Sequence, residues 1–311
     1  MIKTAVVIPT YKRPLMVEQL LDSLAQCAFP PRLDIYVVEN GVRSGTEDVC
    51  KASPIGNRVR YLYSASAGKT PALNLAIQAS DADFFIFFDD DVRVSTGIIE
   101  TYVEAAQRYG PGHFFGGPLL IDAEAPCPAH LVPYLPPSAT GWAFANRETE
   151  IKASEFVFFF GANWGAFRPD LRKSGLFSEH LGPSPAKYAP SGDEQELQRR
   201  LIKASVRAIY LPSAVIRHHV GKECYTKQWV WRRHFRHGVY DYALSLYRSD
   251  RHELQEIFGI PLRVIWSFAK QELKVLASRL LRFAIERRTR IQMRQAYLTG
   301  WLYGAFTRRK T

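Results

Sequence analysis

Residues 84–91 have the sequence FFIFFDDD, an apolar run followed by three aspartates. A short, continuous apolar run indicates a strand that is buried on both faces, as in a parallel sheet. In an open parallel sheet, ligands bind at the edge formed by the carboxyl ends of the strands. The sequence therefore predicts that Asp89, Asp90 and Asp91 lie at a ligand-binding edge.

The residues around this run alternate between strand-like and helix-like patterns. The apolar spacing predicts strands at residues 4–9, 33–38 and 59–63 and helices at residues 15–25 and 71–79. This alternation, with apolar strands, indicates an α/β domain built on a doubly wound mixed sheet with a parallel core.

The second half of the chain gives weaker patterns. Gly and Pro residues between positions 110 and 137 predict turns and loops. We expect further strands at residues 155–160 and 208–211 and a helix that begins at Asp193. The last hundred residues are expected to be mainly helical and basic, with an apolar stripe of Leu273, Leu276, Leu280, Leu281 and Ala284 among arginines.

Charge is divided unevenly along the 311 residues. The chain is 47% apolar and 23% charged, which excludes a mainly disordered protein. Residues 1–198 have a formal charge of −6, and residues 199–311 have a formal charge of +17. A basic region of this size indicates an anionic partner: nucleic acid, an acidic lipid surface or a phosphorylated substrate.

The cysteines and the apolar segments bear on location. No C-x-x-C pair is formed by the four cysteines, which are Cys27, Cys50, Cys127 and Cys224. We therefore expect neither a disulfide framework nor a zinc site, and we expect the protein to be cytoplasmic. No signal peptide is expected, and no apolar run reaches the roughly 18 to 20 residues that a membrane-spanning helix needs.

Three adjacent carboxylates repel one another unless a cation compensates them. Mg²⁺ and Mn²⁺ suit carboxylate oxygens, and they take their other ligands from water and substrate phosphates. The alternative is a solvated acidic turn that caps the next helix. The buried strand before Asp89 favours the metal hypothesis.

Four segments together resemble the inverting glycosyltransferases of family 2, which have the GT-A fold. They are residues 6–14 (VVIPTYKRP), 37–41 (VVENG), 68–74 (GKTPALN) and 89–91 (DDD), and the resemblance extends over about residues 3–240. It implies that Asp91, with Asp89, binds Mn²⁺ or Mg²⁺. It also implies a nucleotide-sugar site formed by Pro9, Thr10, Tyr11, Arg13, Glu39, Lys69, Asn74, Asp89 and Asp90. Glu39, which would contact the base, stands where Asp is more common.

Two later segments are similar to the acceptor and catalytic segments of the family. Residues 160–168 resemble a G-x-N…F-R segment, which implies that Gly161, Asn163 and Trp164 line the acceptor side. Residues 192–197 (GDEQEL) resemble a G-E-D-x-D/E-L segment with its first two acids exchanged. The resemblance assigns the catalytic base to Glu194, with Asp193 as the alternative. Both acids also suit a helix N-terminus.

His218 and His219 follow another expected strand. By the resemblance, one of them supplies a further metal ligand or contacts the diphosphate, and His218 is the better positional match. A structural or solvated role is the alternative. Imidazole is an acceptable ligand for Mn²⁺.

The resemblance implies transfer of one sugar from a UDP, GDP or dTDP sugar to a hydroxyl of a glycan or lipid-linked acceptor. A processive synthase is not expected, because residues 229–235 lack the Q-x-x-R-W pattern. We expect a catalytic domain at residues 1–222, with a nucleotide-sugar half (1–110) and an acceptor half (111–222). Residues 223–311 would either contact the acidic inner face of the membrane or pack as ordinary helices.

Three rival hypotheses remain open. A nucleic-acid-binding protein would use the basic region, but no nucleic-acid-binding motif is present, so no nucleic-acid partner is expected. A nucleotidyltransferase would need a glycine-rich loop after the first strand, and residues 9–13 contain no glycine. An inactive sugar-nucleotide-binding homologue remains compatible with the departures at Glu39, Asp193 and Glu194.

Overall fold

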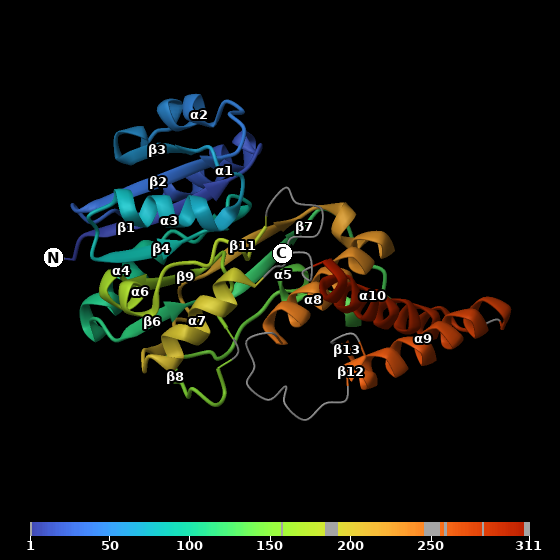
Figure 1. Cartoon of the computed structure of the whole chain (residues 1–311). Coiled ribbons are helices and arrows are strands. Elements are labelled where there is room, and N and C mark those ends of the chain that lie inside the picture. Colours follow the sequence, from blue (N-terminus) through green and yellow to red (C-terminus); the bar gives the residue numbers. More distant parts are fainter. Residues whose placement is uncertain are drawn as a thin grey trace. The chain divides into compact units, whose positions relative to one another are not determined.

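The computed structural model describes residues 2–156, 158–183, 192–245, 256–257, 260–281 and 283–307 (Figure 1). The chain divides into two compact units. The first is formed by the described parts of residues 1–122, 140–185 and 192–219, and the second by those of residues 123–139 and 220–311. All the predicted site residues lie within the first unit.

The first unit is built on an eight-stranded mixed sheet. Across the sheet the strands are β3 (Val59–Ser64), β2 (Leu33–Asn40), β1 (Thr4–Thr10), β4 (Phe84–Phe87), β9 (Trp164–Phe167), β6 (His113–Gly116), β10 (Arg207–Tyr210) and β8 (Thr149–Ile151). The first four run parallel, whereas β9 is antiparallel to both of its neighbours and β8 is antiparallel to β10. The expected mixed sheet with a parallel core is confirmed.

Helices cover both faces of this sheet (Figure 1). Alternate residues of a strand point to opposite faces, so Val6 and Ile8 of β1 join one core and Ala5 and Val7 join the other. The first core includes side chains of α1 (Pro14–Leu24), α2 (Thr46–Ala52) and α4 (Ile98–Tyr109). The second includes side chains of α3 (Lys69–Ala79), α6 (Arg168–Ser174) and α7 (Asp193–Lys203).

The strand register brings the predicted motifs to one edge. Thr10 at the end of β1 pairs with Glu39 of β2, and Val7 pairs with Phe87 of β4. The carboxyl ends of these three strands therefore reach the same edge of the sheet, where residues 89–91 follow β4. The start of α7 is set by Gly192, whose φ of +100° lies in the left-handed region that favours glycine.

A second, three-stranded sheet has the order β5 (Val92–Val94), β11 (Ile216–Val220), β7 (Leu119–Ala123). β5 begins directly after the three aspartates and pairs antiparallel with β11. His218 lies opposite Val92 in this ladder. The two histidines therefore lie within a strand, and not after it as the sequence predicted.

The strand expected at residues 155–160 is wrong for the residues that the structure describes, because 155–156 and 158–160 have no strand geometry. The backbone of Phe159 instead bonds the side chain of Gln198. Phe159 N donates to Oε1 (2.7 Å), and Nε2 donates to Phe159 O (3.0 Å). These two bonds satisfy backbone groups that a sheet ladder would otherwise satisfy.

The second unit is mainly helical, as expected. Its principal helices are α8 (Lys227–Ser245), α9 (Leu262–Leu280) and α10 (Ile285–Thr307). Its shorter elements are the 3-10 turns η2 (Val132–Tyr134) and η3 (Lys222–Tyr225), most of α5 (Pro137–Thr140), and the hairpin of β12 (Glu256–Ile257) and β13 (Ile260–Pro261). The backbones of α8 and α10 touch, since a Cβ at Gly238 would overlap the carbonyl oxygen of Tyr297.

Across the described part of the chain, no helix is both long and apolar enough to span a bilayer.

Candidate active site

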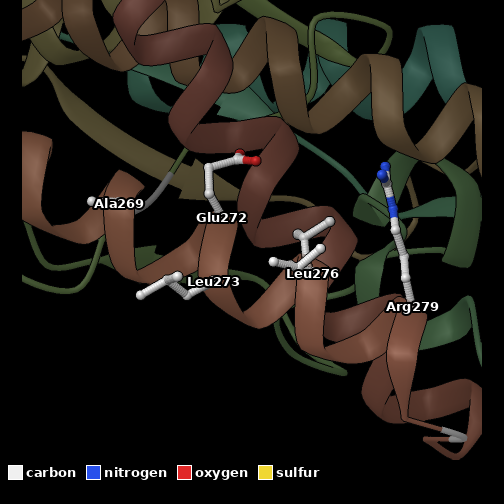
Figure 2. A pocket seen from close by; sticks show the side chains of 6 residues that line it. Ala269, Glu272, Leu273, Leu276 and Arg279 are labelled. Atoms are coloured by element: carbon white, nitrogen blue, oxygen red, sulfur yellow. The ribbon is translucent and has the colours of Figure 1, made fainter.

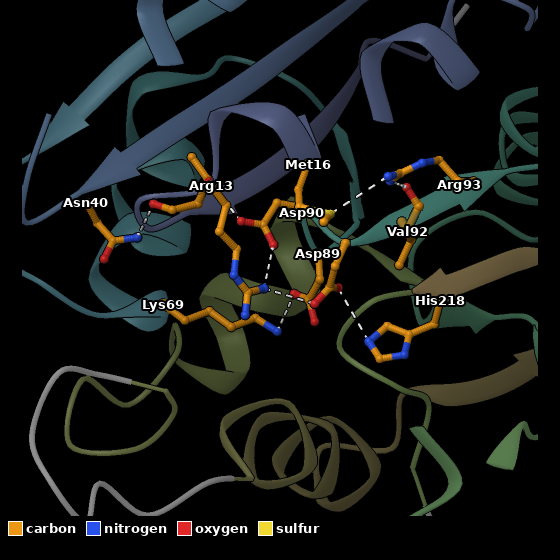
Figure 3. A network of polar contacts seen from close by, with 11 residues as sticks. Arg13, Met16, Asn40, Lys69, Asp89, Asp90, Val92, Arg93 and His218 are labelled. Atoms are coloured by element: carbon orange, nitrogen blue, oxygen red, sulfur yellow. Dashed lines mark hydrogen bonds and ion pairs between the residues drawn. The ribbon is translucent and has the colours of Figure 1, made fainter. Parts of the chain in front are cut away.

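Each of the three aspartates after β4 has a different set of partners (Figure 3). Asp90 is buried, and its carboxylate accepts hydrogen bonds from Thr10 Oγ1 (2.7 Å) and from Arg13 Nη1 (3.2 Å). Arg13 Nη1 also donates to Oδ2 of Asp91 (3.0 Å), and Lys69 Nζ lies 2.5 Å from Oδ1 of Asp89. Two cationic side chains therefore compensate the repulsion expected among the three carboxylates.

The electrostatic environment separates Asp90 from Asp91. Burial, together with the charge of Asp91, raises the pKa of Asp90. Burial also acts to raise the pKa of Asp91, but contacts with His218, Arg13 and Lys69 outweigh it and hold that pKa below its usual value. Asp91 is therefore the more strongly ionised of the two carboxyl groups.

His218 extends from β11 toward Asp91 (Figure 3), with its Nε2 3.4 Å from the buried Oδ1 of that carboxylate. The backbone N–H of His219 donates to the carbonyl oxygen of Asp91 (2.8 Å), which fixes the strand beside the motif. Successive residues of a strand point to opposite faces, so the ring of His219 points away from the face that carries His218. The structure thus brings the imidazole of His218 and the backbone of His219 to Asp91.

Asp91 and His218 are a donor pair that fits a divalent cation. No group of three or more His, Cys, Asp and Glu side chains that could hold a metal occurs in the described ranges. Mg²⁺ in nucleotide-dependent sites commonly takes only one or two protein ligands and completes its shell with water and substrate phosphates. A carboxylate oxygen and an imidazole nitrogen are therefore sufficient protein ligands for a metal that also binds a diphosphate, and Mn²⁺ accepts both atom types.

Lys69, the first residue of α3, joins the aspartates to the start of α7. A Cβ at Gly161 would lie 3.0 Å from Lys69 Nζ and 3.0 Å from the carboxyl carbon of Glu194, so these two side chains flank one glycine. Burial acts to lower the pKa of Lys69, but attraction by Asp89, Asp193 and Glu194 outweighs it and raises that pKa. The ammonium therefore stays charged between the two acidic segments.

Asp193 and Glu194 occupy the first turn of α7 but differ in exposure. Asp193 is 1% exposed, and its carboxyl group packs against Gly182, whereas Glu194 is half-buried. Burial, and then the charge of Glu194, raises the pKa of Asp193 well above its usual value, although Lys69 opposes the shift. Asp193 therefore ionises less readily than an ordinary aspartate, and Glu194 is the more exposed acid of the pair.

Glu39 is buried at the end of β2, and its carboxylate is already fully bonded. Oε1 accepts from Ser44 N (2.7 Å), Ser44 Oγ (2.5 Å) and Thr46 Oγ1 (2.8 Å), and Oε2 accepts from Tyr61 Oη (2.7 Å). Burial acts to raise the pKa of Glu39, but these bonds outweigh it and lower that pKa. Four bonds occupy the capacity of one carboxylate, so Glu39 organises the loop after β2. Its contact with a base stays a prediction.

Three other predicted site residues lie in the protein interior. Asn74 Nδ2 donates to Phe177 O (2.9 Å), and Asn74 Oδ1 accepts from Phe177 N (3.0 Å). Asn163 accepts a hydrogen bond from Tyr102 Oη and donates to the carbonyl oxygens of Pro118 and Ala214. Trp164 is 1% exposed and stacks on Phe87, with ring centroids 4.7 Å apart. Each of these side chains is buried and engaged within the chain, and its contact with donor or acceptor stays a prediction.

The remaining predicted residues lie at or beside the edge. Pro9 is buried in β1, and a Cβ at Gly41 would lie 3.2 Å from the ring of Tyr11. Asn40, for which the sequence predicts no role, connects two loops at this edge. Asn40 Nδ2 donates to Thr10 O (2.7 Å), and Asn40 Oδ1 accepts from Gly68 N (2.9 Å). Asn40 follows Glu39 at the end of a strand, and this position could have indicated a role at the edge of the sheet.

Comparisons with known proteins point to a family of glycosyltransferases. Residues 5–137 match the family described as glycosyl transferase family 2. A curated relative from Campylobacter jejuni, named GalNAc(5)-diNAcBac-PP-undecaprenol beta-1,3-glucosyltransferase, is 24% identical over 184 residues. The matched region is 58% of this chain and only 56% of the relative, so the likeness spans little more than half of that protein.

Two solved structures share the fold. The mannosyltransferase PcManGT from Pyrobaculum calidifontis, in complex with GDP-Man and Mn²⁺, has a TM-score of 0.59 at 17% identity. The alignment covers 99% of this chain and 88% of that protein. TarS of S. aureus has a TM-score of 0.53 at 13% identity, over 96% of this chain and 55% of TarS.

The fold is the GT-A fold, followed by C-terminal helices. The match to glycosyl transferase family 2 extends over residues 5–137 and includes the acidic segment after β4. Lys69 lies close to this segment and to the acidic start of α7.

Proposed function

We propose that this chain is a metal-dependent, inverting glycosyltransferase of family 2 that moves one sugar from a nucleoside diphosphate donor to an acceptor hydroxyl. The observation that carries the proposal is the position of Lys69. Its ammonium lies 2.5 Å from Asp89, and beside Gly161 it flanks the carboxyl group of Glu194. In this arrangement Lys69 would hold the diphosphate of the donor, and Glu194 would act as the general base on the opposite face of the sugar.

Asp91 and His218 are the residues that would hold Mn²⁺ or Mg²⁺ in this proposal. The metal would supply positive charge that neutralises the diphosphate as it leaves. PcManGT, which shares the fold, was solved with GDP-Man and Mn²⁺, and this supports a divalent cation here. Thr10, Arg13 and Lys69 would hold the donor phosphates beside the motif.

Glu194 is the proposed general base. It takes the proton of the acceptor hydroxyl as the acceptor oxygen bonds to the anomeric carbon. The bond from that carbon to the diphosphate breaks on the opposite face, so the configuration inverts. The half-buried position of Glu194 supports this role, since Asp193 is covered by the chain and its pKa is raised by burial.

The proposed donor is a UDP, GDP or dTDP sugar. The name of the curated relative includes a saccharide linked to PP-undecaprenol. This name supports a lipid-linked saccharide or a growing glycan as the acceptor of the present chain. Such an acceptor would place the protein at the cytoplasmic face of a membrane.

The test is release of nucleoside diphosphate from UDP, GDP and dTDP sugars with Mn²⁺. We expect one donor class to be cleaved, and we expect Glu194→Gln to lose at least about 100-fold in rate, the usual contribution of a general base. Glu196→Gln is the matched control, because Glu196 lies in the same turn but pairs with Arg200. Intact donors throughout would refute the transferase in favour of an inactive homologue, and full activity of Glu194→Gln would refute its role as base.

A further inference from the structure

Helix α9 has two faces of opposite environment. Gln271, Val275 and Ser278 are buried, and Gln271 Nε2 donates to the carbonyl oxygen of Ile291 on α10 (2.6 Å). The other face is apolar and exposed, with exposed fractions of 63% for Trp266, 68% for Leu273, 54% for Leu276 and 76% for Leu280. Steps of three, four and seven residues place these four side chains on one stripe, opposite the buried face.

A surface depression lies beside the apolar stripe, and exposed apolar residues continue past the end of α9. A surface depression of about 570 Å³ lies along it, lined by Ala269, Glu272, Leu273, Val275, Leu276 and Arg279 (Figure 2). Past the end of α9, Leu281 is 56% exposed, and Ile285 at the start of α10 is 54% exposed. Exposed apolar side chains in such a series mark an interaction surface.

Cations border the stripe. Lys270 Nζ lies 5.9 Å from the ring centre of Trp266, and Lys274 and Arg279 are exposed on the same helix. Residues 262–307 contain nine Lys or Arg residues and two Glu residues, a formal charge of +7. A partner must therefore offer both an apolar interior and negative charge.

We propose that α9 lies in the headgroup layer of an acidic membrane, with Trp266, Leu273, Leu276 and Leu280 in the acyl boundary and the adjacent cations on lipid phosphates. A basic helix with a tryptophan and leucines on one face binds anionic bilayers in this way. A second copy of the chain would bring the same positive charge to the stripe, and nucleic acid would leave the leucines unburied. The proposal deepens the proposed function, because a lipid-linked acceptor lies in such a membrane.

The experiment measures co-sedimentation of the full chain with phosphatidylcholine vesicles and with vesicles that contain 30% phosphatidylglycerol, about the acidic fraction of many membranes. We expect binding to the acidic vesicles that weakens with salt. Leu273→Gln/Leu276→Gln should lower the partition coefficient by about tenfold or more, because apolar burial supplies much of the binding. Leu120→Gln, an exposed leucine of β7, is the matched control and should bind as the wild type does.

A second readout locates the helix in the bilayer. Brominated acyl chains should quench tryptophan fluorescence in the wild type more than in Trp266→Phe. Far-UV circular dichroism of each variant checks that it is folded. Lys270→Gln/Lys274→Gln should lose the preference for acidic vesicles.

Two results would overturn the proposal. One is equal vesicle binding by the wild type and the folded Leu273→Gln/Leu276→Gln variant. The other is absence of vesicle binding together with a dimer that this variant dissociates, since the stripe would then bind a second copy. Vesicle binding without nucleotide binding would contradict the proposed transferase function but would support the membrane-binding role of α9. The failure of one proposal can therefore be distinguished from the failure of the other.

Discussion

The ammonium of Lys69 lies 2.5 Å from Oδ1 of Asp89, although the two residues come from the start of α3 and the loop after β4. The same ammonium attracts Asp193 and Glu194 at the start of α7. One cation therefore holds together two acidic segments that would otherwise repel each other. The stability of this edge of the sheet depends on that charge.

Replacing Lys69 by methionine should destabilise the fold. The change leaves the Asp89 carboxylate uncompensated beside other acids, and loss of one partner of a largely buried ion pair costs about 3 kcal/mol. Urea denaturation at pH 7 measures the free energy of unfolding. Lys51→Met removes an exposed ion pair with Glu47 and should change nothing measurable. Equal stabilities of the two variants would show that Lys69 does not compensate the acids.

The raised pKa of Asp193 predicts a pH dependence of stability. Between the unfolded pKa of about 3.9 and the higher native pKa, the native state binds more protons than the unfolded state. Stability contributed by this group is therefore full at low pH and falls as pH rises through that window. Asp193→Asn cannot titrate, so it should lose less free energy of unfolding than the wild type as the pH rises above about 4. Parallel pH profiles would contradict a raised native pKa of Asp193.

Substitution of Glu39 distinguishes loop organisation from base contact. Glu39→Ala leaves the Thr46 and Tyr61 hydroxyls without their acceptor and should lower the free energy of unfolding by about 2 kcal/mol. If Glu39 acts through the loop, affinities for UDP, GDP and dTDP should fall by the same factor. Calorimetry of all three measures this, with Glu47→Ala as the control. A change confined to one nucleotide would instead show direct contact with its base.

Arg13 bonds both Asp90 and Asp91, so it opposes a cation at the same carboxylates. Arg13→Ala should bind Mn²⁺ about fivefold more tightly in the absence of nucleotide, because about 1 kcal/mol of charge repulsion is removed. Electron paramagnetic resonance of free Mn²⁺ measures this affinity. Arg60→Ala, which removes a comparably exposed arginine, is the control. Unchanged Mn²⁺ affinity would place the metal away from Asp91.

The strands of the parallel core could be predicted because each is a short apolar run with a polar end. The segment FFIFFDDD alone predicts a buried strand and an acidic edge, and the structure has both. The same criterion failed at residues 155–160. Phe159 and Phe160 are buried there, and Gln198 bonds the backbone of Phe159. No local pattern reveals a partner 39 residues away.

Burial of the predicted site residues could not be read from the sequence. Asn163 and Trp164 are predicted to line the acceptor side, and contacts with Tyr102 and Phe87 show that both side chains are buried. Glu39 is a polar residue at a strand end, which is typical of a site, but its four partners come from the next loop and a neighbouring strand. The exposure of the apolar face of α9 could not be predicted either. An apolar stripe indicates a helix, but it does not say whether that face is buried or in contact with solvent.

The most direct test of the central proposal is calorimetric binding of UDP, GDP and dTDP, each with and without Mn²⁺, to the wild type and to Asp91→Ala. Asp22→Ala, an exposed aspartate of α1, controls for loss of a charge. We predict that one nucleotide binds only with Mn²⁺ and that Asp91→Ala alone abolishes this binding. Absence of binding by folded wild-type protein, or unchanged binding by Asp91→Ala, would contradict a metal-dependent donor site at the end of β4.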